Sequence, residues 1–262
     1  MAHVPRKRFG QHFLHDRHII DKIVAAVDPR PGDVVVEIGP GLGALTAPLL
    51  ERVPQLHVVE IDRDLAGRLE ADFGPERLAV HRADALEFDF GALGAGLRLV
   101  GNLPYNVSTP LLFHVAQFAG RLRDLHFMLQ REVVERMVAA PSSSEYGRLS
   151  VMLQYRFDLE KLFLVAPGCF RPPPKVESAV VRLVPLRRHE PVALDEKLFA
   201  AVVTRAFTRR RKTLRNALAG VAMVEELQGL GIDPGLRPEN LAVADYVRIA
   251  NLAAGRASAS SG

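Results

Sequence analysis

The tetrapeptide Asn102-Leu103-Pro104-Tyr105 combines a polar acceptor, a stiff turn and a flat aromatic ring. The segment before it, residues 97–101, is short and mostly apolar, as in a parallel strand covered on both faces. Asn102 offers a side-chain acceptor, and Pro104 removes a backbone donor, which leaves nearby carbonyl groups free to accept. Acceptors beside the Tyr105 ring suit an exocyclic aromatic amine such as N6 of adenine. The alternative is a local proline turn with a half-buried Tyr105.

A glycine-rich turn, Gly39-Pro40-Gly41-Leu42-Gly43, follows one predicted strand and opens a predicted helix. Glycines let the backbone approach a ligand closely, and the start of a helix supplies unpaired N–H groups. Glu60 lies 21 positions after Gly39 and ends the next predicted strand. A carboxylate there can accept from both hydroxyls of a ribose. The turn also fits the relaxed dinucleotide fingerprint, so it does not by itself separate NAD from other adenosyl ligands.

Asp84 separates the two ligands. It follows the third predicted strand, where its side chain could accept from an adenine amino group. The glycine turn, Glu60, Asp84 and Asn102 each follow a different strand, and together they describe a site for S-adenosylmethionine.

Alternating strand and helix patterns precede and follow these residues, which is typical of βαβ units and a parallel sheet wrapped on both sides. Strands are predicted at residues 34–38, 56–61, 78–82, 97–101 and 125–129, and helices at 19–27, 44–53, 64–73, after Pro110 and at 131–139. Strands 163–165 and 179–184 close the sheet and are expected to run antiparallel. The proline-rich segment 170–175 between them is predicted to be an extended loop outside any ladder.

The strand pattern ends near residue 187, and helices are predicted at 195–207, 209–219 and 239–253. We therefore expect one large domain over residues 1–186 and a small all-helical domain over 187–256. The Ala/Ser-rich residues 257–262 are expected to form a flexible tail.

The composition, with 48% hydrophobic and 24% charged residues among 262, is that of a soluble globular protein with one large and one smaller domain. The single cysteine, Cys169, excludes an intramolecular disulfide and favours a reducing compartment. The sequence shows neither a membrane-length apolar run nor the apolar stretch of a signal peptide, so we expect a cytoplasmic protein without a membrane partner.

Basic residues gather in two segments of this chain, whose net charge is +4. The first is 6–8. The second lies in residues 204–215, which contain no acidic residue, and its members are Arg205, Arg209, Arg210, Arg211, Lys212 and Arg215. Such acid-free clusters predict contact with a nucleic acid.

Over nearly its whole length the chain resembles the bacterial 16S rRNA adenine N6,N6-dimethyltransferase family, a group of class I methyltransferases. The resemblance is carried by segments 8–14, 37–41, 102–108, 130–133 and 170–178, with the basic stretch 209–213. It implies an α/β fold with a Rossmann-like sheet wrapped by helices. It also implies that residues 1–186 form a cofactor-binding catalytic domain and that the small helical domain, 187–256, binds RNA. It also implies that S-adenosylmethionine is contacted by His12, Leu14, Gly39, Gly41, Glu60, Asp84 and Asn102. The family usually has Asn at position 12, so a backbone contact is the one expected to survive there.

The catalytic set implied by the resemblance is Asn102, Leu103, Pro104, Tyr105 and Phe170. We expect the Asn102 oxygen and a carbonyl of the Leu103–Pro104 segment to accept the N6 hydrogens, which would aim the nitrogen lone pair at the methyl group. Tyr105 and Phe170 would stack on the two faces of the base. The alternative for Phe170 is a core aromatic residue near the edge of the sheet. The implied target is two adjacent adenosines in the 3′-terminal hairpin loop of 16S rRNA, each dimethylated, in a small-subunit precursor. A monomer is the default.

Metal chemistry is not expected, because His12, His15 and His18 would spread around a helix and no ligand set completes a site. Four other functions compete with the favoured one. They are methylation of large-subunit rRNA, methylation of adenine in DNA, a non-catalytic assembly or transcription factor, and a dehydrogenase. The absence of a sizeable target-recognition segment argues against DNA, and the intact polar set at Gly39, Glu60, Asp84 and Asn102 argues against lost catalysis.

Overall fold

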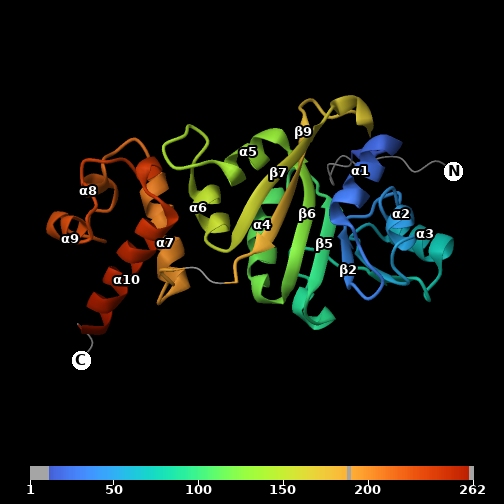
Figure 1. Cartoon of the computed structure of the whole chain (residues 1–262), viewed down its shortest axis with the longest axis horizontal. Helices are drawn as coiled ribbons and strands as arrows, with labels where there is room; N and C mark the ends of the chain where they lie inside the picture. The colour runs from blue at the N-terminus through green and yellow to red at the C-terminus, as the bar shows by residue number, and fades with distance from the viewer. Residues whose placement is uncertain (1–11, 188–189, 260–262) are drawn as a thin grey trace. The chain divides into compact units, whose positions relative to one another are not determined.

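The computed structural model describes residues 12–187 and 190–259, and these fall into two compact units (Figure 1). One unit lies within Met1–Val134 and Phe157–Pro185, and the other within Glu135–Arg156 and Leu186–Gly262. The basic segment 6–8 and residues 260–262 lie outside the described residues.

The first unit is built on a seven-stranded sheet with the order β4-β3-β2-β5-β6-β9-β7. Its strands are β2 (Val35–Ile38), β3 (Leu56–Val59), β4 (Leu78–His81), β5 (Leu97–Asn102), β6 (Leu122–Gln130), β7 (Phe157–Val165) and β9 (Ser178–Pro185). The strands from β4 to β6 are parallel, and β9 runs antiparallel to both β6 and β7. The predicted parallel sheet with an antiparallel closing pair is therefore confirmed.

The strand order places a topological switch point between β2 and β5, the two central neighbours in Figure 1. From β2 the chain continues outward through β3 and β4, and it then returns to β5 on the other side of β2. Ligands of open α/β sheets bind outside the carboxyl ends of the strands at such a point. The turn after β2 and Asn102 at the end of β5 both lie there.

The helices of this unit are α1 (Arg17–Val27), α2 (Thr46–Leu50), α3 (Arg63–Phe73) and α4 (Ser108–Ala116), and α5 (Arg131–Val138) spans the division between the units. The apolar positions of α1 recur at helical spacing, and four of them, Ile20, Ile23, Val24 and Val27, are buried. They share one core with residues of α2 and with Val35, Val58 and Val100 of the sheet. This packing fixes the strands whose ends carry the polar residues.

A two-stranded ladder corrects one expectation. β1 (Phe13–Leu14) pairs antiparallel with β8 (Phe170–Arg171), although the segment from Phe170 was predicted to lie outside any ladder. The ladder stops immediately before Pro172, because proline has no N–H to donate. The pairing ties the N-terminal segment to the proline-rich loop.

The second unit contains α6 (Arg148–Gln154), α7 (Glu196–Thr208), α8 (Leu214–Ala217), α9 (Val224–Gly229) and α10 (Val243–Ala259). Its core includes Tyr146 and Tyr155 together with Phe199 and Tyr246, so residues 135–156 pack with the C-terminal helices. The division therefore differs from the contiguous boundary expected at residue 186. Helix α10 also continues to Ala259, past the start of the expected tail at residue 257.

The helix predicted at 209–219 is also wrong in extent. Residues 209–211 form turns, residue 212 is a bend, and α8 covers only Leu214–Ala217. The N–H of Leu214 donates to Leu236 and that of Arg215 donates to Pro234, so a neighbouring loop takes the first backbone donors of α8. The N–H groups of Leu214 and Arg215 therefore cannot donate to the carbonyl groups of the preceding basic residues, as a continuous helix from residue 209 would require.

Arg98 is a buried cation at the start of β5. Its guanidinium donates to Asp124 at 2.7 Å and to Asp33 at 2.8 Å, and also to the carbonyl groups of Val27 and Asp28 at the end of α1. The Arg98 side chain is 7% exposed. We expect Arg98→Ala to lower the free energy of unfolding by about 3–5 kcal/mol, because Asp124, whose side chain is only 13% exposed, would lose the guanidinium that compensates its charge.

Urea unfolding at pH 7 measures this loss. The control is Arg182→Ala, which removes an ion pair with Glu160 whose side chains are 45% and 58% exposed. That variant should lose less than about 1 kcal/mol. Equal losses in the two variants would show that the Arg98 cluster contributes nothing beyond a surface pair.

Candidate active site

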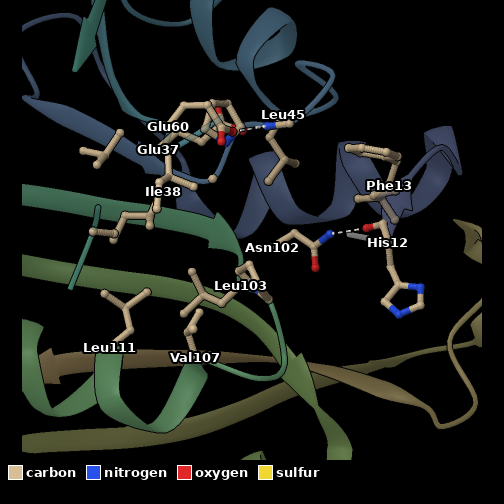
Figure 2. A pocket seen from close by; sticks show the side chains of 18 of the residues that line it. His12, Phe13, Glu37, Ile38, Leu45, Glu60, Asn102, Leu103, Val107 and Leu111 are labelled. Atoms are coloured by element: carbon tan, nitrogen blue, oxygen red, sulfur yellow. Dashed lines mark hydrogen bonds between the residues drawn. The ribbon is translucent and has the colours of Figure 1, made fainter. Parts of the chain in front are cut away.

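A pocket opens at the carboxyl ends of β2, β3 and β5, within the first unit (Figure 2). It brings together residues that are far apart in the sequence but were predicted to act together: His12, Leu14, Gly39, Gly41, Glu60, Asp84, Asn102, Leu103, Pro104 and Tyr105. Of the predicted site residues, only Phe170 does not line it.

Glu60 holds the glycine turn after β2. Its carboxylate accepts from the N–H of Gly41 at 3.2 Å and from the N–H of Asp62 at 2.8 Å. Burial raises the pKa of the Glu60 carboxyl, although these backbone hydrogen bonds act in the opposite direction. Gly41 has a φ of +58°, a region that favours glycine, and a Cβ there would lie 3.1 Å from the Phe13 ring. Each carboxylate oxygen retains a lone pair for a further donor such as a ribose hydroxyl.

Asp84 borders the same pocket after β4. Its Oδ1 accepts from the N–H of Leu86 at 2.9 Å, which fixes the side chain in a local turn. Its Oδ2 makes no hydrogen bond with the described residues. That oxygen can therefore accept from an exocyclic amine of a ligand.

Asn102 presents an amide whose orientation is defined by its neighbour. The side-chain Nδ2 donates to the backbone carbonyl of His12 at 2.8 Å. A carbonyl only accepts, so the nitrogen must face His12 and the oxygen must point elsewhere. Figure 2 shows that oxygen directed away from His12. The site thus holds an acceptor, and not a donor, at the end of β5.

Gly101 explains why Asn102 can sit so close to the turn after β2. A Cβ at this position would lie 2.5 Å from the carbonyl oxygen of Ile38, at the end of the neighbouring strand. Any side chain would therefore push β5 away from β2 where the two strands end. The next residue, Leu103, donates from its N–H to Met128 at 3.1 Å, which continues the ladder to β6.

Tyr105 is held at three places. Its hydroxyl shares a 2.6 Å hydrogen bond with Ser178, and its backbone carbonyl accepts from the Ser108 hydroxyl at 3.1 Å. The His12 ring lies beside its ring, with centroids 5.5 Å apart and planes at 28°. Burial raises the pKa of the Tyr105 hydroxyl, so this group remains protonated.

Phe170 does not lie where the sequence placed it. Its side chain is 2% exposed and packs in the core with Leu14, its ladder partner in β1. A ring buried in this way cannot stack on a base in the described arrangement. The aromatic ring beside Tyr105 is instead that of His12, whose Nδ1 donates to the Pro172 carbonyl at 2.8 Å.

Glu37 is a pocket residue that the sequence reasoning did not select. It lies inside β2, is 2% exposed, and accepts from the Thr46 hydroxyl at 2.6 Å. Burial, with a smaller contribution from Glu60, raises its pKa to about 8. The carboxyl is therefore largely protonated at neutral pH in the ligand-free protein. The sequence held one signal that could have identified Glu37 as a site residue, namely its position as an acidic residue within the otherwise apolar run 34–38.

The raised pKa of Glu37 gives the ligand-free protein a pH dependence. Between about pH 4.5 and 8 the unfolded chain releases a proton that the folded protein keeps, so stability falls as the pH rises. Glu37→Gln removes this cost and should stabilise the protein by about 2–5 kcal/mol at pH 7. Urea unfolding at pH 5, 7 and 8 measures the change, with the exposed Glu51→Gln as control. An unchanged pH slope in Glu37→Gln would contradict this assignment.

Among residues 12–187 and 190–259 no group of three or more His, Cys, Asp or Glu side chains could hold a metal ion. Within the same part of the chain no helix is long and apolar enough to cross a bilayer.

Comparison with known proteins agrees with this geometry. The family model described as "Ribosomal RNA adenine dimethylase" matches residues 2–255. "Ribosomal RNA small subunit methyltransferase A" of Thiobacillus denitrificans is 63% identical over 247 residues, covering 94% of this chain and 97% of the relative. The protein of the same name from Nitrosospira multiformis is 61% identical over 251 residues, with coverages of 96% and 97%.

Two solved structures share the fold over both units. A dimethyladenosine transferase from Plasmodium falciparum has a TM-score of 0.79 and 26% identity, with 91% of this chain and 96% of that chain covered. The 23S rRNA methyltransferase ErmE has a TM-score of 0.70 and 26% identity, with coverages of 91% and 98%. The sheet and the pocket at its switch point define a class I methyltransferase fold that uses S-adenosylmethionine. The chain belongs to the ribosomal RNA adenine dimethylase family.

Proposed function

We propose that this protein transfers methyl groups from S-adenosylmethionine to N6 of two adjacent adenosines in the 3′-terminal hairpin loop of 16S rRNA, during maturation of the small ribosomal subunit. The observation that carries the proposal is the orientation of the Asn102 amide at the pocket: its Nδ2 donates to the His12 carbonyl, so its oxygen is directed away from His12 and is available as an acceptor. The names of the relatives, at 61–63% identity, support the choice of the small subunit. A monomer in the cytoplasm is part of the same proposal.

The residues of the pocket fit S-adenosylmethionine. Glu60 has lone pairs for the ribose hydroxyls, and Asp84 Oδ2 can accept from the adenine amino group of the cofactor. Gly39 and Gly41 have no Cβ, so the turn that contains them leaves room for a ligand to approach the backbone closely. Bound there, the cofactor supplies an electrophilic methyl group on a sulfonium.

Asn102 and one backbone carbonyl orient the target amine. Of the two carbonyl groups in the Leu103–Pro104 segment, that of Pro104 already accepts from Val107 at 3.2 Å, so we assign the second acceptor to Leu103. Two acceptors for the two N6 hydrogens favour a pyramidal nitrogen whose lone pair points at the methyl carbon. These bonds strengthen as positive charge develops on nitrogen, so they stabilise the transition state more than the ground state. Tyr105 offers a face on which the base stacks.

The attacked amine becomes acidic as the new bond forms, so water can remove its proton. The site therefore needs no dedicated base. What it must supply is alignment, because holding two reactants in line removes much of the entropic cost of the reaction.

The basic cluster of the second unit divides into two groups. Three members bind within their own unit: Arg205 donates to the Ala219 carbonyl, Arg209 to that of Asn216, and Arg210 to that of Ser144. The other three are exposed and have no side-chain partner among the described residues: Arg211, Lys212 and Arg215. Arg211 and Lys212 line a hollow at the end of α7. We assign phosphate contacts with rRNA to this exposed group.

Nucleoside mass spectrometry tests the proposed function. The protein is incubated with labelled S-adenosylmethionine and undermethylated small subunits, and the RNA is then digested. We expect labelled N6,N6-dimethyladenosine in the 16S fraction. Parallel reactions with large subunits and with duplex DNA test the two competing targets. The likeness to ErmE is the reason for including the large subunit. Labelling of either substrate in place of 16S rRNA would reject the proposed target, and no labelling at all would reject the activity.

A further inference from the structure

Ser178 lies outside the predicted site but touches it through Tyr105. The two hydroxyl oxygens are 2.6 Å apart, and Ser178 is 0% exposed at the start of β9. It pairs with Gln130 of β6 on one side and with Val165 of β7 on the other. A residue held by two neighbouring strands is a rigid anchor.

The hydroxyl bond completes the restraint on the Tyr105 ring. The Ser108 bond fixes the backbone of Tyr105 at the start of α4, whereas Ser178 fixes the far end of the side chain. Without the second bond, the far end of the side chain would lose its one hydrogen bond, and the stacked His12 ring would be left to restrain the plane of the Tyr105 ring. A buried hydrogen bond between two hydroxyl groups contributes about 0.5–1.5 kcal/mol.

We propose that Ser178 is a positioning residue for methyl transfer, which fixes through its bond to the Tyr105 hydroxyl the plane on which the target base stacks. This inference rests on the proposed function. The contribution of Ser178 should differ between the two methyl transfers, because the substrate of the second transfer has fewer N6 hydrogens to donate to the two acceptors.

In each transfer the N6 lone pair forms a bond to the methyl carbon while the bond from carbon to sulfur breaks. The electron pair of that bond stays on sulfur, which becomes a neutral thioether, and a proton leaves N6 to water. Unmodified adenosine offers two N6 hydrogens to the two acceptors, Asn102 and Leu103. N6-methyladenosine offers one. Stacking on Tyr105 therefore carries a larger share of the alignment in the second transfer.

The test compares Ser178→Ala and Tyr105→Phe, which remove the same hydrogen bond from its two ends, with the double variant. Each single variant should slow the second transfer about 3- to 10-fold more than the first, so that N6-methyladenosine accumulates. The double variant should be no slower than the more impaired single variant, because both act on one interaction. Single-turnover time courses with nucleoside mass spectrometry give both rate constants.

The matched control is Ser150→Ala. Ser150 is also 0% exposed, and its hydroxyl donates to the Arg136 carbonyl within the second unit. This variant should lower the unfolding temperature without changing the product ratio. If Ser178→Ala does not fold, Tyr105→Phe decides alone, because phenylalanine keeps the ring.

An unchanged product ratio in Tyr105→Phe, or additive effects in the double variant, would overturn the positioning role. A wild-type protein that forms no methylated adenosine would instead overturn the proposed function. The two failures are thus distinguishable.

Discussion

Asn102→Ala should lower the rate constant of methyl transfer by about 10²–10³, which is the usual cost of removing one oriented group that stabilises developing charge. The variant loses the acceptor that faces the pocket and the bond from Nδ2 to His12. Single-turnover kinetics with saturating S-adenosylmethionine measure the effect. Binding of RNA should change little, because the phosphate contacts are assigned to the second unit.

The control measurement is the RNA affinity of the same variant at a fixed salt concentration. A large loss of turnover with nearly unchanged affinity supports the catalytic role. Equal losses of turnover and affinity would contradict it, because Asn102 would then act in binding or in folding.

Replacing Arg211, Lys212 and Arg215 together with glutamine should weaken RNA binding and flatten its salt dependence. Each phosphate contact contributes about 0.7–0.9 to the slope of log K against log salt, so the slope should fall by about 2–3. These three side chains are exposed and make no partner contact within the described residues, so stability should be unchanged. Filter binding of 16S rRNA fragments between 50 and 200 mM salt measures the slope.

The matched control changes charge by the same amount elsewhere. Arg17, Arg68 and Arg182 are exposed arginines of the first unit, and each pairs with a carboxylate. Their triple glutamine variant should keep the wild-type slope. If both triple variants flatten the slope equally, net charge and not a specific contact determines the affinity.

The polar residues of the pocket could be predicted because a strand can be recognised from the pattern of neighbouring residues in the sequence. Short, mostly apolar runs end at Glu60, just before Asn102 and two residues before Asp84, and parallel strands bring their carboxyl ends to one edge. The antiparallel closing pair followed from the same reasoning. These features depend on the identity and spacing of neighbouring residues.

The errors concern contacts between distant segments. The pairing of Leu14 with Phe170 joins the two ends of the first unit and buries a ring that the spacing alone left beside the site. The packing of Tyr146 and Tyr155 against C-terminal helices is equally invisible in a linear pattern. Charge patterning likewise could not separate Arg210, which binds the Ser144 carbonyl, from its exposed neighbour Arg211.

The most direct test of the central claim is a crystal structure of this protein with S-adenosylhomocysteine and an RNA hairpin that carries the unmethylated adenosines. The account predicts that N6 of one adenine lies about 2.7–3.2 Å from Asn102 Oδ1, within hydrogen-bonding distance, and faces the sulfur of the cofactor. An adenine bound elsewhere, with no base at Asn102, would contradict it.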